Sequence, residues 1–98
     1  MKRYSYAELV PICKHDLRLA KMLEEVVDTA LETVLVAVRR GGRPNTLHRL
    51  AIALEELNSH LQTLEGKGFL VDSRTLQDQD KLAVWAGEMV FEIYRNRS

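Results

Sequence analysis

Six leucines recur at heptad spacing in the middle of the chain, and this repeat constrains the fold more than any other feature of the sequence. Successive members lie 3, 4, 3, 4 and 3 residues apart: Leu47, Leu50, Leu54, Leu57, Leu61 and Leu64. A period of about 3.5 residues keeps one seam of a helix against a neighbouring helix. Asn45 precedes the repeat as a candidate N-cap, and Gly66 follows it as a candidate stop. The pattern therefore predicts a helix from Asn45 to about Glu65.

The residues beside the leucine seam distinguish a bundle core from a free-standing zipper. A zipper carries charged side chains at these flanking positions. Here the flanking positions hold other residues: Ala51, Ala53, Asn58 and His60. Because Ile52 also lies on the opposite face, the first half of the helix is apolar almost all round, as is typical of a helix surrounded by neighbours. We expect the seam to form the core of a helical bundle, and the same helix can also contribute to an intermolecular contact.

A second long helix is predicted from about Asp16 to Arg40. One stripe of mostly apolar positions recurs along it at spacings of 4, 3, 4, 3 and 4 residues: Leu19, Leu23, Val26, Ala30, Thr33 and Ala37. Cations stabilise a helix C-terminus, where Arg39 and Arg40 stand, and Gly41 supplies a stop. The β-branched run 33–38 leaves a short buried strand open as an alternative. We favour the helix because the run continues the upstream period.

The N-terminal segment carries a helix signal of its own. Ser5 is followed three residues later by Glu8, which is a capping-box pattern. Pro11 leaves two interpretations open. A short helix can end near Pro11, or Pro11 can be the first residue of the next helix, where its missing N–H is no loss.

A C-terminal helix is predicted after the apolar segment 69–71. Its candidate caps are Asp72, Ser73 and Asp78, and its core face is apolar: Leu82, Trp85, Ala86, Met89, Val90 and Ile93. Gly87 lowers the helix propensity of this segment, so it is a candidate for the close approach of another helix. Phe91 lies off the core stripe, alongside Val84. It either anchors a partner protein or packs against 69–71, and the sequence supports both alternatives equally.

Length and composition place these helices in one small domain. With 98 residues the chain fits a single helical domain over 1–98, with room for one modest core. The predicted fold is all-α, a small bundle of three long helices, with or without a short N-terminal helix. The 14 basic and 14 acidic side chains cancel, so the chain lacks the bulk positive field of non-specific nucleic-acid binders. Near-zero net charge favours association.

Cysteine content and hydropathy bear on the compartment. Cys13 is the single cysteine, which excludes an intrachain disulfide and a cysteine-based zinc site. Glu8 and Pro11 interrupt any signal-peptide core, and no apolar run reaches the roughly 18 residues that a membrane helix needs. We therefore expect a cytoplasmic protein that does not bind a membrane.

Basic residues gather around the predicted turn between the two long helices. This group, the arginine corner, has five members: Arg39, Arg40, Arg43, His48 and Arg49. Backbone N–H groups of a helix start and guanidinium groups together suit a phosphate or carboxylate. The alternative is that two arginines complement a helix C-terminus and the others are solvated. The alternative is favoured because no aromatic residue interleaves to stack on bases.

The segment RRGGRPNTLHRLAIALEEL, residues 39–57, resembles the closing part of Cro/repressor-type helix-turn-helix domains. In that family a loop containing Gly and Pro follows the recognition helix and leads into a TL-x-x-LA-x-AL helix. The resemblance implies that 32–38 occupies the recognition-helix position in the major groove, with Glu32 and Thr33 as its polar contacts. A DNA-binding regulator is therefore the alternative function.

Catalytic templates each lack a second element. Glu25, Asp28 and Glu32 share a helix face and could gather a cation. This acidic segment resembles part of the magnesium site of the all-α nucleotide pyrophosphohydrolases. That site also needs an E-x-x-E segment, which the sequence does not contain. Glu56 and His60 are four residues apart, which gives two metal ligands at most. Cys13 is either a reactive thiol beside basic neighbours or, as we favour, an inert half-buried one.

We therefore expect a non-enzyme without cofactor, metal or small-molecule substrate. The predicted function is protein–protein interaction, as a regulator, inhibitor, adaptor or immunity-type protein, with a protein partner, a homodimer, or both. Nucleic acid is a secondary possibility, through the arginine corner. The candidate interface residues are apolar: Phe91, Trp85, Leu57, Leu61 and Leu64.

Overall fold

A computed structural model describes residues 2–40, 45–64 and 67–97, except for the side chains of Arg40 and Arg97. Its elements, in chain order, are β1 (Lys2–Arg3), α1 (Tyr6–Cys13), α2 (Leu17–Arg40), α3 (Thr46–Leu61), β2 (Gly68–Phe69), α4 (Ser73–Gln77) and α5 (Gln79–Arg97). The prediction of an all-α bundle of three long helices is confirmed, and the short N-terminal helix is present.

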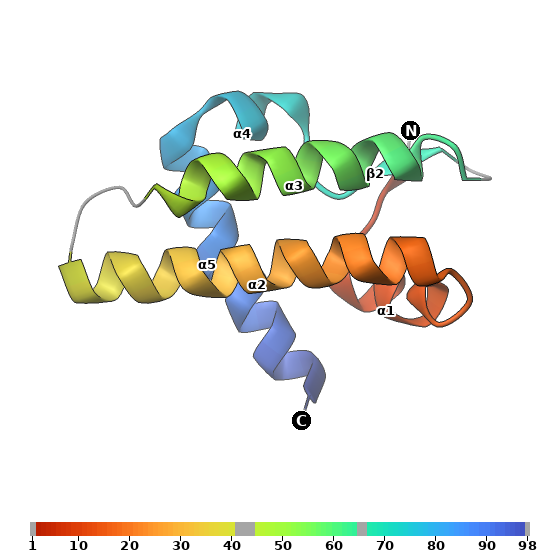
Figure 1. Cartoon of the computed structure of the whole chain (residues 1–98), viewed down its shortest axis with the longest axis horizontal. Coiled ribbons are helices and arrows are strands. Elements are labelled where there is room, and N and C mark those ends of the chain that lie inside the picture. Colours follow the sequence, from red (N-terminus) through yellow and green to blue (C-terminus); the bar gives the residue numbers. More distant parts are fainter. Residues whose placement is uncertain (1, 41–44, 65–66, 98) are drawn as a thin grey trace.

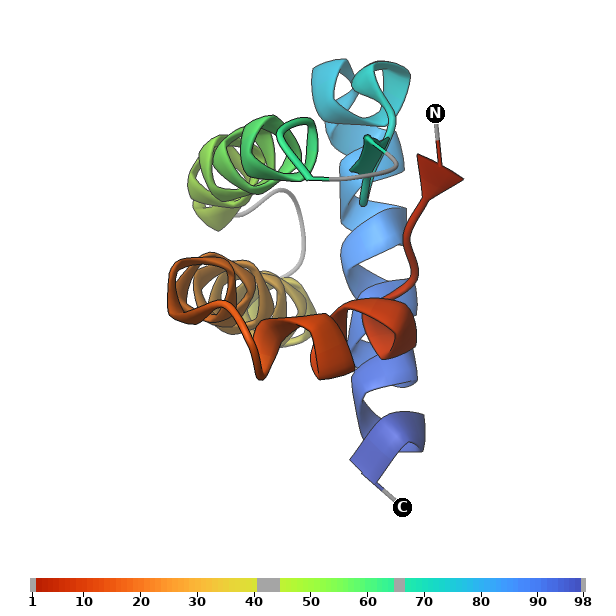
Figure 2. The ribbon, with the colours of Figure 1, turned by 90° about the vertical axis from the view of Figure 1, so that its right-hand side faces the viewer.

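The three long helices form two layers. α2 and α3 lie side by side and antiparallel, and α5 crosses both of them (Figure 1). α1 packs against the start of α2 and against α5, so it closes one end of the bundle (Figure 2). The C-terminal turns of α5 extend past α2 in both views.

The leucine seam forms the centre of the core, as predicted. Its first five members are all buried: Leu47, Leu50, Leu54, Leu57 and Leu61. α3 ends at Leu61 rather than near Glu65, and Leu64 lies half-buried beyond it. The early end coincides with Thr63, whose hydroxyl donates to the carbonyl of His60 at 2.7 Å. Asn45 has helical φ and ψ and makes no capping hydrogen bond, because a capping side chain needs an extended backbone.

The predicted start and length of α2 are confirmed. Asp16 Oδ1 accepts from the backbone N–H of Leu19 at 3.0 Å and caps the helix. The β-branched run 33–38 is helical, so the strand alternative is wrong. The Ser5–Glu8 capping box is present, and α1 continues two residues beyond Pro11. Pro11 therefore does not begin the next helix; it removes only the hydrogen bond to the exposed Ala7 carbonyl, which water can satisfy.

The C-terminal segment uses two of its three candidate caps. Asp72 accepts from the N–H of Thr75 at 2.8 Å and starts α4, while Asp78 accepts from the N–H of Asp80 at 3.0 Å and starts α5. The predicted core face of α5 is buried, with Val90 partly so. The close approach expected at Gly87 is wrong, since an added Cβ there would meet nothing within 4 Å.

Side chains of α3 hold the segment that follows it. The Asn58 amide donates to the carbonyl of Val71 and accepts from the N–H of Leu70, both at 2.8 Å. Gln62 donates to the carbonyl of Gly68 at 2.9 Å. These bonds fix β2, which pairs in parallel with β1. This pair of strands could not be predicted from the sequence, because two-residue strands have no periodicity.

Candidate interaction surface

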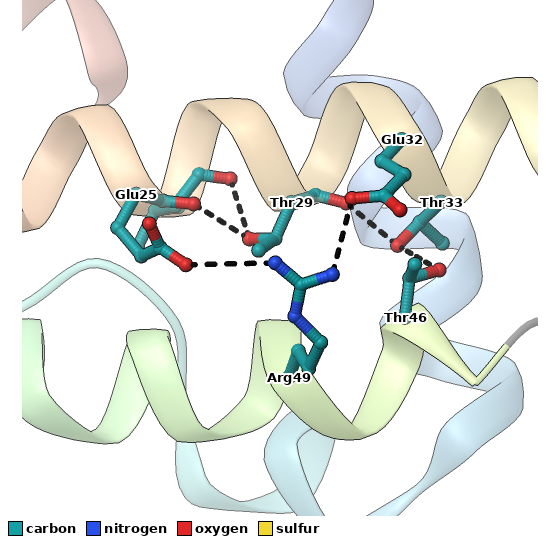
Figure 3. Close-up of polar contacts among 7 residues, drawn as sticks. Glu25, Thr29, Glu32, Thr33, Thr46 and Arg49 are labelled. Atoms are coloured by element: carbon teal, nitrogen blue, oxygen red, sulfur yellow. Dashed lines mark hydrogen bonds and ion pairs between the residues drawn. The ribbon is translucent and has the colours of Figure 1, made fainter.

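The arginine corner is divided by the fold. Arg39 and His48 are exposed, whereas Arg43 and the side chain of Arg40 lie outside the described residues. Arg49 turns back from α3 toward α2, where its guanidinium lies 3.3 Å from a carboxylate oxygen of Glu32 and 4.0 Å from one of Glu25 (Figure 3). Arg49 therefore joins two helices, and its charge is compensated within the chain.

The two acidic residues of that bridge were candidates for a cation site. Both Glu25 and Glu32 pair with Arg49 across the two helices. In the ranges 2–40, 45–64 and 67–97, no three His, Cys, Asp or Glu side chains are placed to bind a metal ion.

Threonines fill the buried polar positions between α2 and α3. Thr33 and Thr46 are both buried, and their hydroxyl oxygens lie 2.9 Å apart, while Thr33 also donates to the carbonyl of Thr29 at 2.7 Å (Figure 3). Thr29 in turn donates to the carbonyl of Glu25 at 2.8 Å. The bonds to carbonyl groups lie within α2, and the contact between Thr33 and Thr46 joins α2 to α3.

The two polar residues of the predicted recognition helix, like the threonines above, make contacts within the bundle. Glu32 pairs with Arg49, and Thr33 is buried. A helix-turn-helix needs a turn between its two helices, whereas Leu17–Arg40 is one continuous helix. The geometry around 32–38 therefore gives the DNA-binding alternative no support.

His60 has a partner that sequence spacing did not reveal. Its Nε2 lies 3.1 Å from Oδ2 of Asp16, 44 residues away, rather than against Glu56. The backbone N–H of Leu19 and the His60 ring together hold the pKa of the Asp16 carboxyl below its usual range. This pair ties the end of α3 to the start of α2.

Cys13 has the surroundings of an inert thiol. Partial burial raises the pKa of Cys13, and the Asp16 carboxylate raises it further. Because the thiolate is the nucleophilic form, both effects reduce its reactivity.

Most of the candidate interface residues lie in the core. Leu57 and Leu61 are fully buried, Trp85 is 8 % exposed, and Leu64 is half-buried. These side chains stabilise the bundle and do not form an accessible surface. Phe91 differs from them, because it is 65 % exposed and segment 69–71 does not cover it.

Phe91 belongs to a larger apolar surface on α5. Val84 is 63 % exposed and Tyr94 is 62 % exposed, and Gly87 lies exposed between them. Spacings of 3, 4 and 3 residues place these four residues on one side of the helix, opposite the core stripe. We call this surface the α5 outer face: Val84, Gly87, Phe91 and Tyr94. The sequence pointed to Phe91 and Val84, and Tyr94 could have been added because it lies three residues after Phe91.

Charged residues flank the α5 outer face on one side. Glu88 and Arg95 are both exposed, and the Arg95 guanidinium lies 5.9 Å from the centre of the Phe91 ring, in a cation–π contact. A shallow hollow of about 450 Å³ adjoins Phe91 and is also lined by Ala7 of α1. The surface thus combines exposed aromatic rings, mixed charge and a shallow depression.

Comparisons with protein-family models, curated proteins and solved structures found no match for this chain. Among the described residues, no helix is both long enough and apolar enough to cross a membrane. The function must therefore be inferred from the surface itself.

Proposed function

We propose that this chain is a non-catalytic interaction protein that binds another protein through the α5 outer face. The observation that carries the proposal is the exposure of Val84, Phe91 and Tyr94 on one side of a single helix. Contiguous exposed apolar surface on a small protein commonly marks a binding site. Aromatic side chains also dominate the binding energy of protein interfaces.

The α5 outer face is a better candidate than the arginine corner. Arg49 is compensated by Glu25 and Glu32, and the exposed Arg39 and His48 fit the solvated alternative. Phe91 and Tyr94, in contrast, have large apolar surfaces that water solvates poorly, so covering them is favourable. A role as regulator, inhibitor or adaptor in the cytoplasm is part of the proposal. The half-buried single cysteine is consistent with that compartment.

A binding experiment with matched variants tests the proposal. The full chain and its Phe91→Ser variant are used as bait in affinity capture from the native cell, with cross-linking. We expect the co-captured protein, whether a second copy or another chain, to fall at least tenfold for Phe91→Ser, as roughly 1.4 kcal/mol or more is lost with an aromatic anchor.

The matched control is Val38→Ser on α2, because Val38 is 81 % exposed and lies outside the α5 outer face. It should leave capture unchanged. Equal capture by wild type and Phe91→Ser would contradict the proposal, provided that circular dichroism shows both variants to be folded.

A further inference from the structure

The exposed aromatic residues lie in the C-terminal half of α5. The last turns of this helix extend beyond α2 (Figures 1 and 2), and Ala7 of α1 lines the hollow beside Phe91. Phe91 and Tyr94 are 65 % and 62 % exposed, so a second helix can contact both rings from the side away from the core.

Charges beside the aromatic residues are ordered in a self-complementary way. Glu88 precedes Phe91 by three residues, and Arg95 follows it by four, so both flank the same side of the ring. In an antiparallel pair of α5 helices, Phe91 of each copy lies opposite Tyr94 of the other. The same register places Glu88 of each copy opposite Arg95 of the other, which gives two symmetric ion pairs.

A parallel pair has no such match. Consider a parallel pair of α5 helices with Val84, Gly87, Phe91 and Tyr94 along its seam. In that pair Glu88 of one helix would lie opposite Ala83 of the other, and Arg95 would lie opposite Val90. The order of charges thus selects the antiparallel arrangement.

The composition of the chain permits the association of two copies. Net charge of zero adds no overall repulsion between copies.

We propose that the C-terminal part of the α5 outer face, with Phe91 and Tyr94, is covered by the α5 helix of a second copy, antiparallel, with Phe91 against Tyr94 and Glu88 against Arg95 of the opposite copy. This inference rests on the function proposed above and names its partner. It adds a register that the proposed function does not require.

A charge-exchange series tests the register in the full chain. The variants are Glu88→Arg, Arg95→Glu and the double exchange Glu88→Arg/Arg95→Glu, with sedimentation velocity over a dilution series as the readout. Each single variant places like charges opposite each other twice and should weaken the dimer about tenfold. The double exchange restores opposite charges and should return the dissociation constant to within about threefold of wild type.

Two outcomes would overturn the inference. If the double exchange does not restore association, and circular dichroism shows that the fold is retained, the antiparallel register is wrong. A wild-type chain that stays monomeric up to about 1 mM removes the second copy as the occupant. In that second case, capture of a different protein that is lost in Phe91→Ser leaves the proposed function standing, so the two failures are distinguishable.

Discussion

Gly87 and Gly68 differ in the space around their α-carbons. An added Cβ at Gly87 would meet nothing within 4 Å, whereas one at Gly68 would clash with the Tyr4 ring and lie 2.5 Å from the carbonyl oxygen of Lys2. The difference depends on the N-terminal segment, which covers one glycine and not the other. Two substitutions follow from it.

Gly87→Ala is expected to raise the free energy of unfolding by up to about 1 kcal/mol, since alanine has the higher helix propensity and no neighbour opposes its Cβ. Urea unfolding followed by circular dichroism measures the change. A loss of stability would show that another element approaches α5 at this point.

Gly68→Ala is expected to lower the free energy of unfolding by about 1–3 kcal/mol, because the Tyr4 ring and the paired β1 backbone must move to admit a methyl group. The same urea measurement applies, and Tyr4→Ala/Gly68→Ala is the control. If the clash with Tyr4 causes the loss, Gly68→Ala should cost less in the Tyr4→Ala background than in wild type. An equal cost in both backgrounds would assign the effect to the backbone instead.

Asp16 makes stability depend on acid pH. Its pKa in the folded chain is lowered by the Leu19 N–H and by His60, below an unfolded value of about 3.9. The ionised carboxylate therefore stabilises the fold above that unfolded pKa, and the stabilisation disappears as the pH falls through the lower folded pKa. We expect the stability difference between wild type and Asp16→Asn to be largest above about pH 4 and to shrink on further acidification. A difference that does not change with pH, in urea unfolding between about pH 2 and pH 7, would contradict this account.

At the scale of elements, the pairing of α2 with α3 depends on a buried polar contact. Thr33 and Thr46 are hydrogen-bonded at 2.9 Å and both are buried. Thr33→Val leaves the Thr46 hydroxyl without this partner and should lower the free energy of unfolding by about 1–2 kcal/mol. Thr33→Val/Thr46→Val should cost less than the sum of the single changes, because both partners are then removed. Strict additivity in this double-mutant cycle would show that the two hydroxyls are not coupled.

The predictability of each element follows from where its stabilising contacts lie in the sequence. α2, α3 and α5 have periodic apolar faces, and their stripes identified most of the core; Ala37, the last member of the predicted α2 stripe, is exposed. β1 and β2 depend on Asn58 and Gln62, whose hydrogen bonds reach 6 to 13 residues along the chain to backbone groups. Such contacts leave no repeat in the sequence. The His60–Asp16 pair, 44 residues apart, was missed for the same reason.

The candidate site was predictable to a lesser degree than the fold. Helix phase alone placed Phe91 and Val84 away from the core of α5. Helix phase could not decide whether Phe91 contacts a partner protein or segment 69–71, because that depends on how the segment crosses α5. The arginine corner looked like one cluster in the sequence, but Arg49 is drawn to Glu25 and Glu32 by the antiparallel packing of α2 and α3.

At the scale of the whole molecule, the bundle is flat, with extents of 40 × 31 × 18 Å. Because the bundle is only two helix layers thick, much of each long helix lies at the surface, and the core that stabilises the fold is small relative to that surface. Association through the α5 outer face would cover the aromatic part of that surface and leave α2 and α3 unchanged. We therefore propose that two copies of this chain meet through α5, and not through the leucine seam or the arginine corner.

The place of contact can be mapped by recording the amide chemical shifts of the wild-type chain over a dilution series. We expect concentration-dependent shifts in residues 88–97, with smaller changes near Ala7, which lines the hollow beside Phe91. Val38 and Ile52, exposed on α2 and α3, should stay constant. Shifts centred on 39–49, or on the leucine seam of α3, would show that the copies meet elsewhere.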